Sequence, residues 1–87
     1  MEILIRVTQD HIRRGYRWSR DRNPVALAIN EQCNVMSYVD DEHTDIYAND
    51  GKFIGFVFTD NIAHQNLIRY NSGGIMEPFE FELEDIL

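Results

Sequence analysis

The residues of this chain with the clearest capacity for chemistry form a basic, aromatic stretch near its start. The segment IRRGYRWSRDRNP, residues 12–24, holds five of the eight basic residues of an 87-residue chain whose net charge is −7. Guanidinium groups bind phosphates or carboxylates, and the rings of Tyr16 and Trp18 offer faces on which bases can stack. The stretch therefore indicates either a nucleic-acid contact or a set of ion pairs. Its candidate contact residues are Arg13, Arg14, Arg17, Trp18, Arg20 and Arg22.

Acidic residues are concentrated in two later stretches, DDEHTD at 40–45 and EPFEFELED at 77–85. Duplex DNA carries one phosphate charge about every 1.7 Å along its axis, and a dense array of carboxylates can imitate that spacing. Such an array would bind the basic groove of a protein that handles nucleic acids. The alternative is that these acids belong to solvated turns and to the wet face of a strand. The candidate partner-binding residues are Asp40, Asp41, Glu42, Asp45, Glu80 and Glu82.

The two kinds of cluster divide the chain into oppositely charged parts. Residues 1–24 carry six arginines and three acids, a charge of +3, whereas residues 25–87 carry two basic residues and twelve acids, a charge of −10. Nucleic-acid-binding domains are usually basic overall, and ten net negative charges would repel a nucleic acid. The charge pattern therefore favours arginines that pair with carboxylates, within one chain or across a homodimer, with Trp18 packed against the fold.

Metal and catalytic sites have little support in the sequence. Cys33 is the only cysteine, which excludes an intramolecular disulfide and a cysteine-rich zinc site. The spacing in DDEHTD does not match a calcium-binding loop, and His43 alone does not make a zinc site. The sequence has no phosphate-binding glycine loop and no nucleophile elbow. We therefore expect no metal, no cofactor and no enzymatic activity.

Hydrophobic periodicity and turn residues predict eight elements in a single domain that spans residues 1–87. Period-two alternation indicates the strands, and apolar stripes between capping residues indicate the helices. The order β-α-α-β-β-β-α-β predicts an α+β fold, in which an antiparallel sheet of four to five strands packs against two to three short helices. The predicted strands are 2–7, 35–39, 45–48, 52–58 and 78–84, and the predicted helices are 8–15, 23–34 and 59–74.

Capping residues and apolar faces refine this expectation. Thr8, Asn23 and Thr59 are placed to cap the starts of the three helices, and Gly15 is placed to end the first helix in a left-handed conformation. Residues 52–58, KFIGFVF, are apolar on both faces, which is typical of a central strand. Residues 40–45 are predicted to form a polar turn.

Three segments resemble a group of small proteins that are common in phages and also found in bacteria. VTQDHIRRG, PVALAI and PFEFEL match its V-T-Q-x-H-I-x-x-G start, P-V-A-L-A helix and P-F-x-F-x-L end. The resemblance covers both ends of the chain, whereas residues 35–58 share only the general character. Similar sequences often carry Cys-x-x-Cys before the helix, where this chain has Arg20 and Asn23, so any metal or redox role of those cysteines is absent here. The group has no assigned activity, and the resemblance implies a phage setting.

Setting, size and charge together predict a small interaction protein. Small acidic phage proteins are often inhibitors of host defence, such as anti-CRISPR and anti-restriction proteins. We expect such binding to a host complex that handles nucleic acids, through the acidic surface. The alternative is a nucleic-acid-binding module that uses the loop at 13–22. The sequence shows no signal peptide and no membrane-spanning stretch, so we expect a cytoplasmic protein without a membrane partner.

Overall fold

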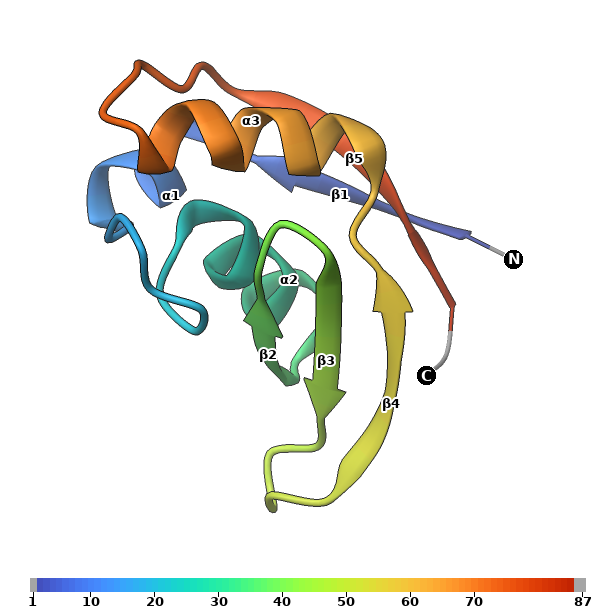
Figure 1. The fold of residues 1–87 in the computed structure, drawn as a ribbon. Coiled ribbons are helices and arrows are strands. Elements are labelled where there is room, and N and C mark those ends of the chain that lie inside the picture. The colour runs from blue at the N-terminus through green and yellow to red at the C-terminus, as the bar shows by residue number, and fades with distance from the viewer. Residues whose placement is uncertain (1, 86–87) are drawn as a thin grey trace.

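The computed structural model describes residues 2–85, which form five strands and three helices (Figure 1). The α+β class, the order of the elements and their numbers agree with the prediction. The strands form two antiparallel sheets rather than one, in the orders β1–β5 and β2–β3–β4. The elements are β1 (Glu2–Val7), α1 (Gln9–Arg14), α2 (Pro24–Cys33), β2 (Met36–Val39), β3 (His43–Tyr47), β4 (Phe53–Phe58), α3 (Asn61–Asn71) and β5 (Phe79–Glu84).

The first and last strands of the chain form the two-stranded sheet. β1 pairs with β5 so that Ile5 lies opposite Phe81 and Ile3 lies opposite Leu83. Because opposite residues of an antiparallel pair share a face, these four side chains form one apolar surface that is turned toward the core. The glutamates that alternate with them along β5 are exposed, as the sequence predicts.

Helix α2 connects the two sheets, because it contacts both β1 and β2. Asn23 caps its start by accepting a hydrogen bond from the backbone N–H of Ala26, and Pro24 is its first residue, as predicted. The helix ends at Cys33, and Asn34 follows it in the left-handed conformation. An apolar helix with a polar cap at each end can be buried without leaving its terminal backbone groups unsatisfied.

Gly15 ends α1 for a different reason from the predicted one. Thr8 caps the start of that helix as expected, but Gly15 has a φ of −73° and is not left-handed. A Cβ atom at this position would lie 2.6 Å from the ring carbons of Pro24. The glycine is therefore required because the start of α2 packs directly against the end of α1.

Strand β4 lies at the edge of the three-stranded sheet, so the prediction of a central strand is wrong, and β3 takes the central place. Val57 points into the core and is 7% exposed. The rings of Phe53, Phe56 and Phe58 are 56%, 52% and 75% exposed. Apolar residues on both faces of a strand usually indicate a neighbour on each side, and here one side of β4 has none within residues 2–85.

Helix α3 begins one residue later than expected. Asp60, not Thr59, is its N-cap and accepts a hydrogen bond from the backbone N–H of Ile62. The hydroxyl of Thr59 donates instead to the backbone carbonyl of Asp40 at 2.9 Å and lies 3.1 Å from the hydroxyl of Thr44. Thr59 thus fastens the end of β4 to the β2–β3 hairpin.

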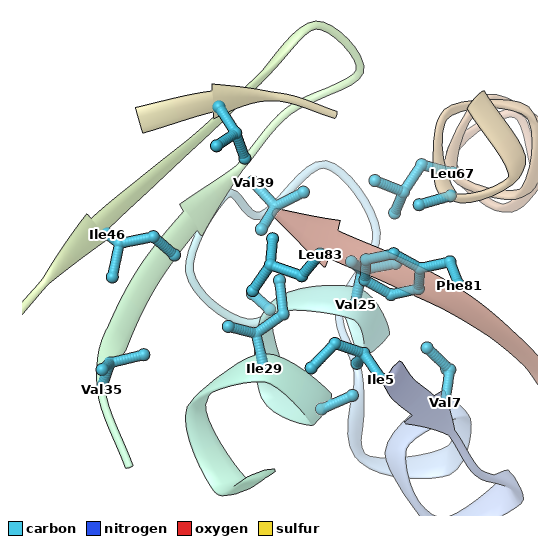
Figure 2. Close-up of a cluster of buried hydrophobic side chains, with 14 of the residues drawn as sticks. Ile5, Val7, Val25, Ile29, Val35, Val39, Ile46, Leu67, Phe81 and Leu83 are labelled. Atoms are coloured by element: carbon cyan, nitrogen blue, oxygen red, sulfur yellow. The ribbon is translucent and has the colours of Figure 1, made fainter. Parts of the chain in front are cut away.

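One hydrophobic cluster joins the two sheets and the helices. Figure 2 shows Ile5 of β1, Ile46 of β3 and Ile29 of α2 turned toward one another, with Leu67 of α3 close to Phe81 of β5. The three isoleucines are fully buried. The core therefore depends on contacts between segments that are far apart in the sequence.

Candidate functional site

The basic loop between α1 and α2 is fastened to the end of α3 by Arg17. Its Nε donates to the backbone carbonyl of Tyr70 at 2.6 Å, and its terminal nitrogen donates to the carbonyl of Gly74 at 3.0 Å. The guanidinium carbon also lies 4.5 Å from the centre of the Tyr70 ring. A cation that binds the last carbonyls of a helix is also favoured by the helix dipole. Arg17 thus binds backbone carbonyls of its own chain.

Trp18 has an unusual backbone and an exposed ring. Its φ is 63°, in the left-handed region, where a bulky side chain costs about 1–2 kcal/mol. Its backbone N–H donates to the side-chain oxygen of Asn71 at 2.9 Å, which helps to hold this conformation. The indole is 77% exposed, so the expectation that Trp18 packs against the fold is wrong. Contacts from Arg17 and Asn71 hold the loop in a shape that presents the indole to solvent.

The far end of the same loop is fastened to β2 by Asn23 and Arg20. The side-chain nitrogen of Asn23 donates to the carbonyls of Ser19 and Val39, at 2.9 and 2.8 Å. The backbone N–H of Val39 donates to the carbonyl of Arg20 at 2.7 Å. The guanidinium of Arg20 lies 3.4 Å from a carboxylate oxygen of Asp45 and 3.6 Å from one of Asp40. The basic loop therefore pairs with the first acidic stretch of its own chain.

The predicted polar turn at 40–45 is shorter in the structure, because β3 already begins at His43. Asp40 closes the turn, since its Oδ1 accepts from the backbone N–H groups of Glu42 and His43 at 2.8 and 2.6 Å. Burial raises the pKa of Asp40, but these two hydrogen bonds and Arg20 outweigh it and lower the pKa below its ordinary value. Asp40 is thus a structural residue of the turn.

Replacing Asp40 by asparagine is expected to weaken the acid sensitivity of the fold. Because the folded-state pKa lies below the ordinary 3.8, ionised Asp40 contributes stability above that pH, which is lost as the pH falls through the folded value. Urea unfolding measured at pH values between about 7 and 2.5 should show a smaller loss of unfolding free energy below about pH 4 in D40N than in the wild type. Asp41→Asn is the control and should keep the wild-type profile; an unchanged profile in D40N would contradict the assignment.

A cavity of about 350 Å³ lies between the basic loop, the 40–42 turn and the end of α3. Trp18, Val39 and Ile68 supply its apolar wall, and Ile68 is 45% exposed. Asp41 stands at the rim with an exposed carboxylate that has no hydrogen-bond or ion-pair partner within residues 2–85. The remaining polar groups of the wall come from Ser19, Arg20, Asn23, Asp40, Asn71 and Ser72.

The chemistry of this cavity suits a cationic side chain with an aliphatic stem. Asp40 is already opposed by Arg20, so the charge that remains available is the carboxylate of Asp41. An indole face attracts a lysine or arginine head group, and the stem of such a residue packs on apolar walls. Trp18, Ile68 and Asp41 can therefore all contact one ligand side chain at the same time.

The remaining arginines of the basic stretch differ in their engagement. Arg13 and Arg14 each lie 2.9 Å from Asp10 on the same helix, and Arg14 also lies 3.3 Å from Glu31 of α2. Hydrogen bonding from Arg14 is the largest cause of a lowered pKa at Asp10. The side chain of Arg22 has no such contact within the described part of the chain. Exposed pairs of this kind are weak, but they occupy the guanidinium groups that a phosphate would need.

The acids of the last strand lie apart from this cavity. Glu80 and Glu82 are on β5, on the sheet that does not hydrogen-bond with the hairpin carrying Asp41. Glu80 lies 2.9 Å from Arg6 and lines a second hollow of about 470 Å³. Hydrogen bonding with Glu82 raises the pKa of Glu2 on β1. The acids that the sequence groups as one partner-binding set are thus divided between two sheets.

Comparisons with known proteins add no relative: no family model, no curated protein and no solved structure matches the chain. Within residues 2–85 no three histidine, cysteine, aspartate or glutamate side chains are grouped so that they could hold a metal ion. No helix in the same range combines the length and the apolar character that crossing a membrane requires.

Six residues that line the cavity, Ile68 and Asn71 among them, were not among the sequence candidates. Ile68 directly follows Leu67 on α3, and the two residues have similar apolar side chains. Leu67 is buried and Ile68 is exposed because only Leu67 lies on the buried stripe of the helix. That stripe contains Ala63, Leu67 and Tyr70, so its spacing indicated that Ile68 points away from the core. Asn71 carried no sequence signal, because its partner is a backbone group 53 residues away.

Proposed function

We propose that this chain is a small interaction protein, without a reaction of its own, that binds another protein at the Trp18 cavity. The observation that carries the proposal is the combination of an exposed indole, an apolar wall and the carboxylate of Asp41, which has no partner within residues 2–85. A lysine or arginine of the partner would insert between them. Exposed aromatic residues beside a pocket are typical anchors of protein interfaces.

The charge of the chain defines the kind of partner. Residues 25–87 have a net charge of −10, so a partner with a basic surface would be attracted over a long range. Proteins that handle nucleic acids carry such surfaces. The resemblance to phage proteins adds host defence complexes, of the kind that anti-CRISPR and anti-restriction proteins inhibit, as the target class we propose.

The alternative, a nucleic-acid-binding module formed by residues 13–22, has less support from the geometry. Four of its five guanidinium groups, those of Arg13, Arg14, Arg17 and Arg20, contact acids or carbonyls of the same chain. Phosphate binding would have to break these contacts in the field of a net negative protein. Trp18 and Tyr16 stay exposed and could stack on bases, so the experiment below includes a nuclease arm.

Neutralising Asp41 is expected to weaken binding of basic ligands. Trp18 is the only tryptophan of the sequence, so its fluorescence reports on the cavity directly. A short arginine- and lysine-containing peptide should change this fluorescence, and Asp41→Asn should weaken the binding about two- to fivefold, the value of one exposed ion pair. Glu84→Gln removes the same charge from β5 and is the matched control. Equal weakening in both variants would indicate a non-specific charge effect and contradict the proposed site.

The partner itself can be sought by capture from a host lysate with and without nuclease. A stoichiometric protein that survives nuclease and is lost with Asp41→Lys would support the proposed function. Retention of that protein by Asp41→Lys, or of nucleic acid alone, would contradict it. If nuclease treatment removed all bound protein, the result would support the alternative, in which residues 13–22 bind nucleic acid.

A further inference from the structure

The outer face of the three-stranded sheet is a connected layer of aromatic side chains. Tyr38 and Tyr47 are 5.4 Å apart between ring centres, and Tyr47 is 5.2 Å from Phe53. His43 lies 5.7 Å from Phe56 and 5.4 Å from Phe58. The three phenylalanines of β4 are all more than half exposed. A sheet face this rich in exposed rings is unusual for a surface in contact with water alone.

The two edge strands of this sheet, β2 and β4, differ in whether another segment of the chain covers their outer edge. The outer edge of β2 is closed, because both backbone groups of Val39 are bound by the basic loop through Arg20 and Asn23. The outer edge of β4 has no strand beside it within residues 2–85. The pairing of β4 with β3 is regular from Gly55 to Phe58, and the one irregularity leaves Ile54 of β4 without a partner residue between Phe53 and Gly55. An open, regular, apolar edge is a template for another strand.

We propose that two copies of this chain pair through their β4 strands, antiparallel about a two-fold axis, to form a six-stranded sheet. A two-fold axis makes each contact occur twice, so a single open edge is sufficient for a closed dimer. Residues that lie opposite in an antiparallel pair share a face, so the exposed phenylalanines of one copy meet those of the other. The proposal does not depend on the function of the Trp18 cavity.

The exposed phenylalanines supply part of the area that a dimer needs. With about 200 Å² for a whole phenylalanine, the exposed fractions of Phe53, Phe56 and Phe58 amount to roughly 350 Å² per chain. Two copies would bring together roughly 700 Å² of ring surface, more than half of the ~1,200 Å² at which stable interfaces begin. Ile54 and Met36, 37% and 38% exposed, add further apolar surface.

The charge distribution favours a second copy over a nucleic acid. Residues 53–58, FIGFVF, contain no charged residue, so two chains of net charge −7 can meet here without opposing charges of like sign. The acid of β3 on this face, Asp45, is already paired with Arg20. Single-stranded RNA also stacks on exposed rings, but it requires a groove of several cations beside them. Arg20 is paired with Asp45, and Lys52 is the only lysine or arginine of residues 35–58.

Lysine substitutions on β4 test the dimer. Light scattering after size exclusion, over about 5 μM to 500 μM protein, should show a concentration-dependent dimer for the wild type. Phe56→Lys and Phe58→Lys should each raise the dimer dissociation constant about tenfold or more, because each removes an apolar ring beside the seam and places like charges of the two copies near each other. Ile75→Lys makes a comparable change at a loop residue that is 80% exposed and should leave the dimer intact.

Two further outcomes keep the proposal open to refutation. A wild type that stays monomeric throughout this range overturns it, as does a dimer that both β4 variants retain. If the variants lose their circular dichroism signal, they do not fold and cannot test the dimer. Amide hydrogen exchange of the wild type is then measured instead, and the protection of residues 53–58 must increase with protein concentration. A monomer whose β4 rings bind oligouridylate would instead assign this face to RNA and overturn the dimer.

Discussion

Ile29→Ala is expected to lower the free energy of unfolding by about 3 kcal/mol. Ile29 is fully buried on α2, where Figure 2 shows its side chain directed toward those of Ile5 and Ile46. Truncation of a buried isoleucine removes transfer energy and leaves a cavity, at a cost of about 2–5 kcal/mol. A domain of this size has on the order of 5 kcal/mol of stability in total. Chemical denaturation followed by circular dichroism should therefore show a large shift of the midpoint with little change in slope.

Ile62→Ala is the control for this prediction. Ile62 is also helical but is 50% exposed on α3, so the same chemical change should alter the free energy of unfolding by less than about 1 kcal/mol. Helix propensity changes equally in the two variants, so the difference between them isolates the burial. Comparable losses in both variants would contradict the placement of Ile29 at the centre of the core.

Asn23→Ala is expected to cost about 2–4 kcal/mol, the second largest effect. Asn23 is 2% exposed, caps α2 through Ala26 and donates to the carbonyls of Ser19 and Val39. Loss of an N-cap costs about 1 kcal/mol. The buried carbonyl of Val39 would also lose a donor, which adds about 1–3 kcal/mol. The loss should appear in urea unfolding, together with a change in Trp18 fluorescence, because the loop is no longer fastened to β2.

Asn23→Ser separates the two roles of this residue. Serine is as good an N-cap as asparagine, but it is too short to donate to both carbonyls. We expect N23S to recover about 1 kcal/mol of the loss in N23A and to retain the change in Trp18 fluorescence. Full recovery in N23S would show that the hydrogen bonds to Ser19 and Val39 contribute nothing, and that the loop is positioned by other contacts.

Local signals in the sequence predicted the elements well. The caps at Thr8 and Asn23, the proline at the start of α2 and the alternation along β5 all depend on residues a few positions apart. Such short-range patterns are set by backbone geometry, so they hold in almost any tertiary context. The order of the elements and the α+β class followed from them.

Three of the wrong predictions depended on contacts with other segments of the chain. Gly15 is required by Pro24, Thr59 is drawn to the β2–β3 hairpin, and Trp18 is held outward by Asn71. The apolar character of β4 was visible in the sequence, but the sequence does not state whether a second strand of the same chain covers that edge. A strand that pairs with a second copy would show the same composition as a central strand.

The sequence by itself determined the elements, their order, the buried face of β5 and the separation of a basic start from an acidic remainder. Only the tertiary structure decided that Arg20 faces Asp40 and Asp45, that Glu80 and Glu82 lie on the other sheet, and that the cavity gathers Trp18 with Asp41. The reason is physical: caps and alternation are properties of neighbouring residues, whereas ion pairs, cavities and open edges arise where chain folding brings distant residues together.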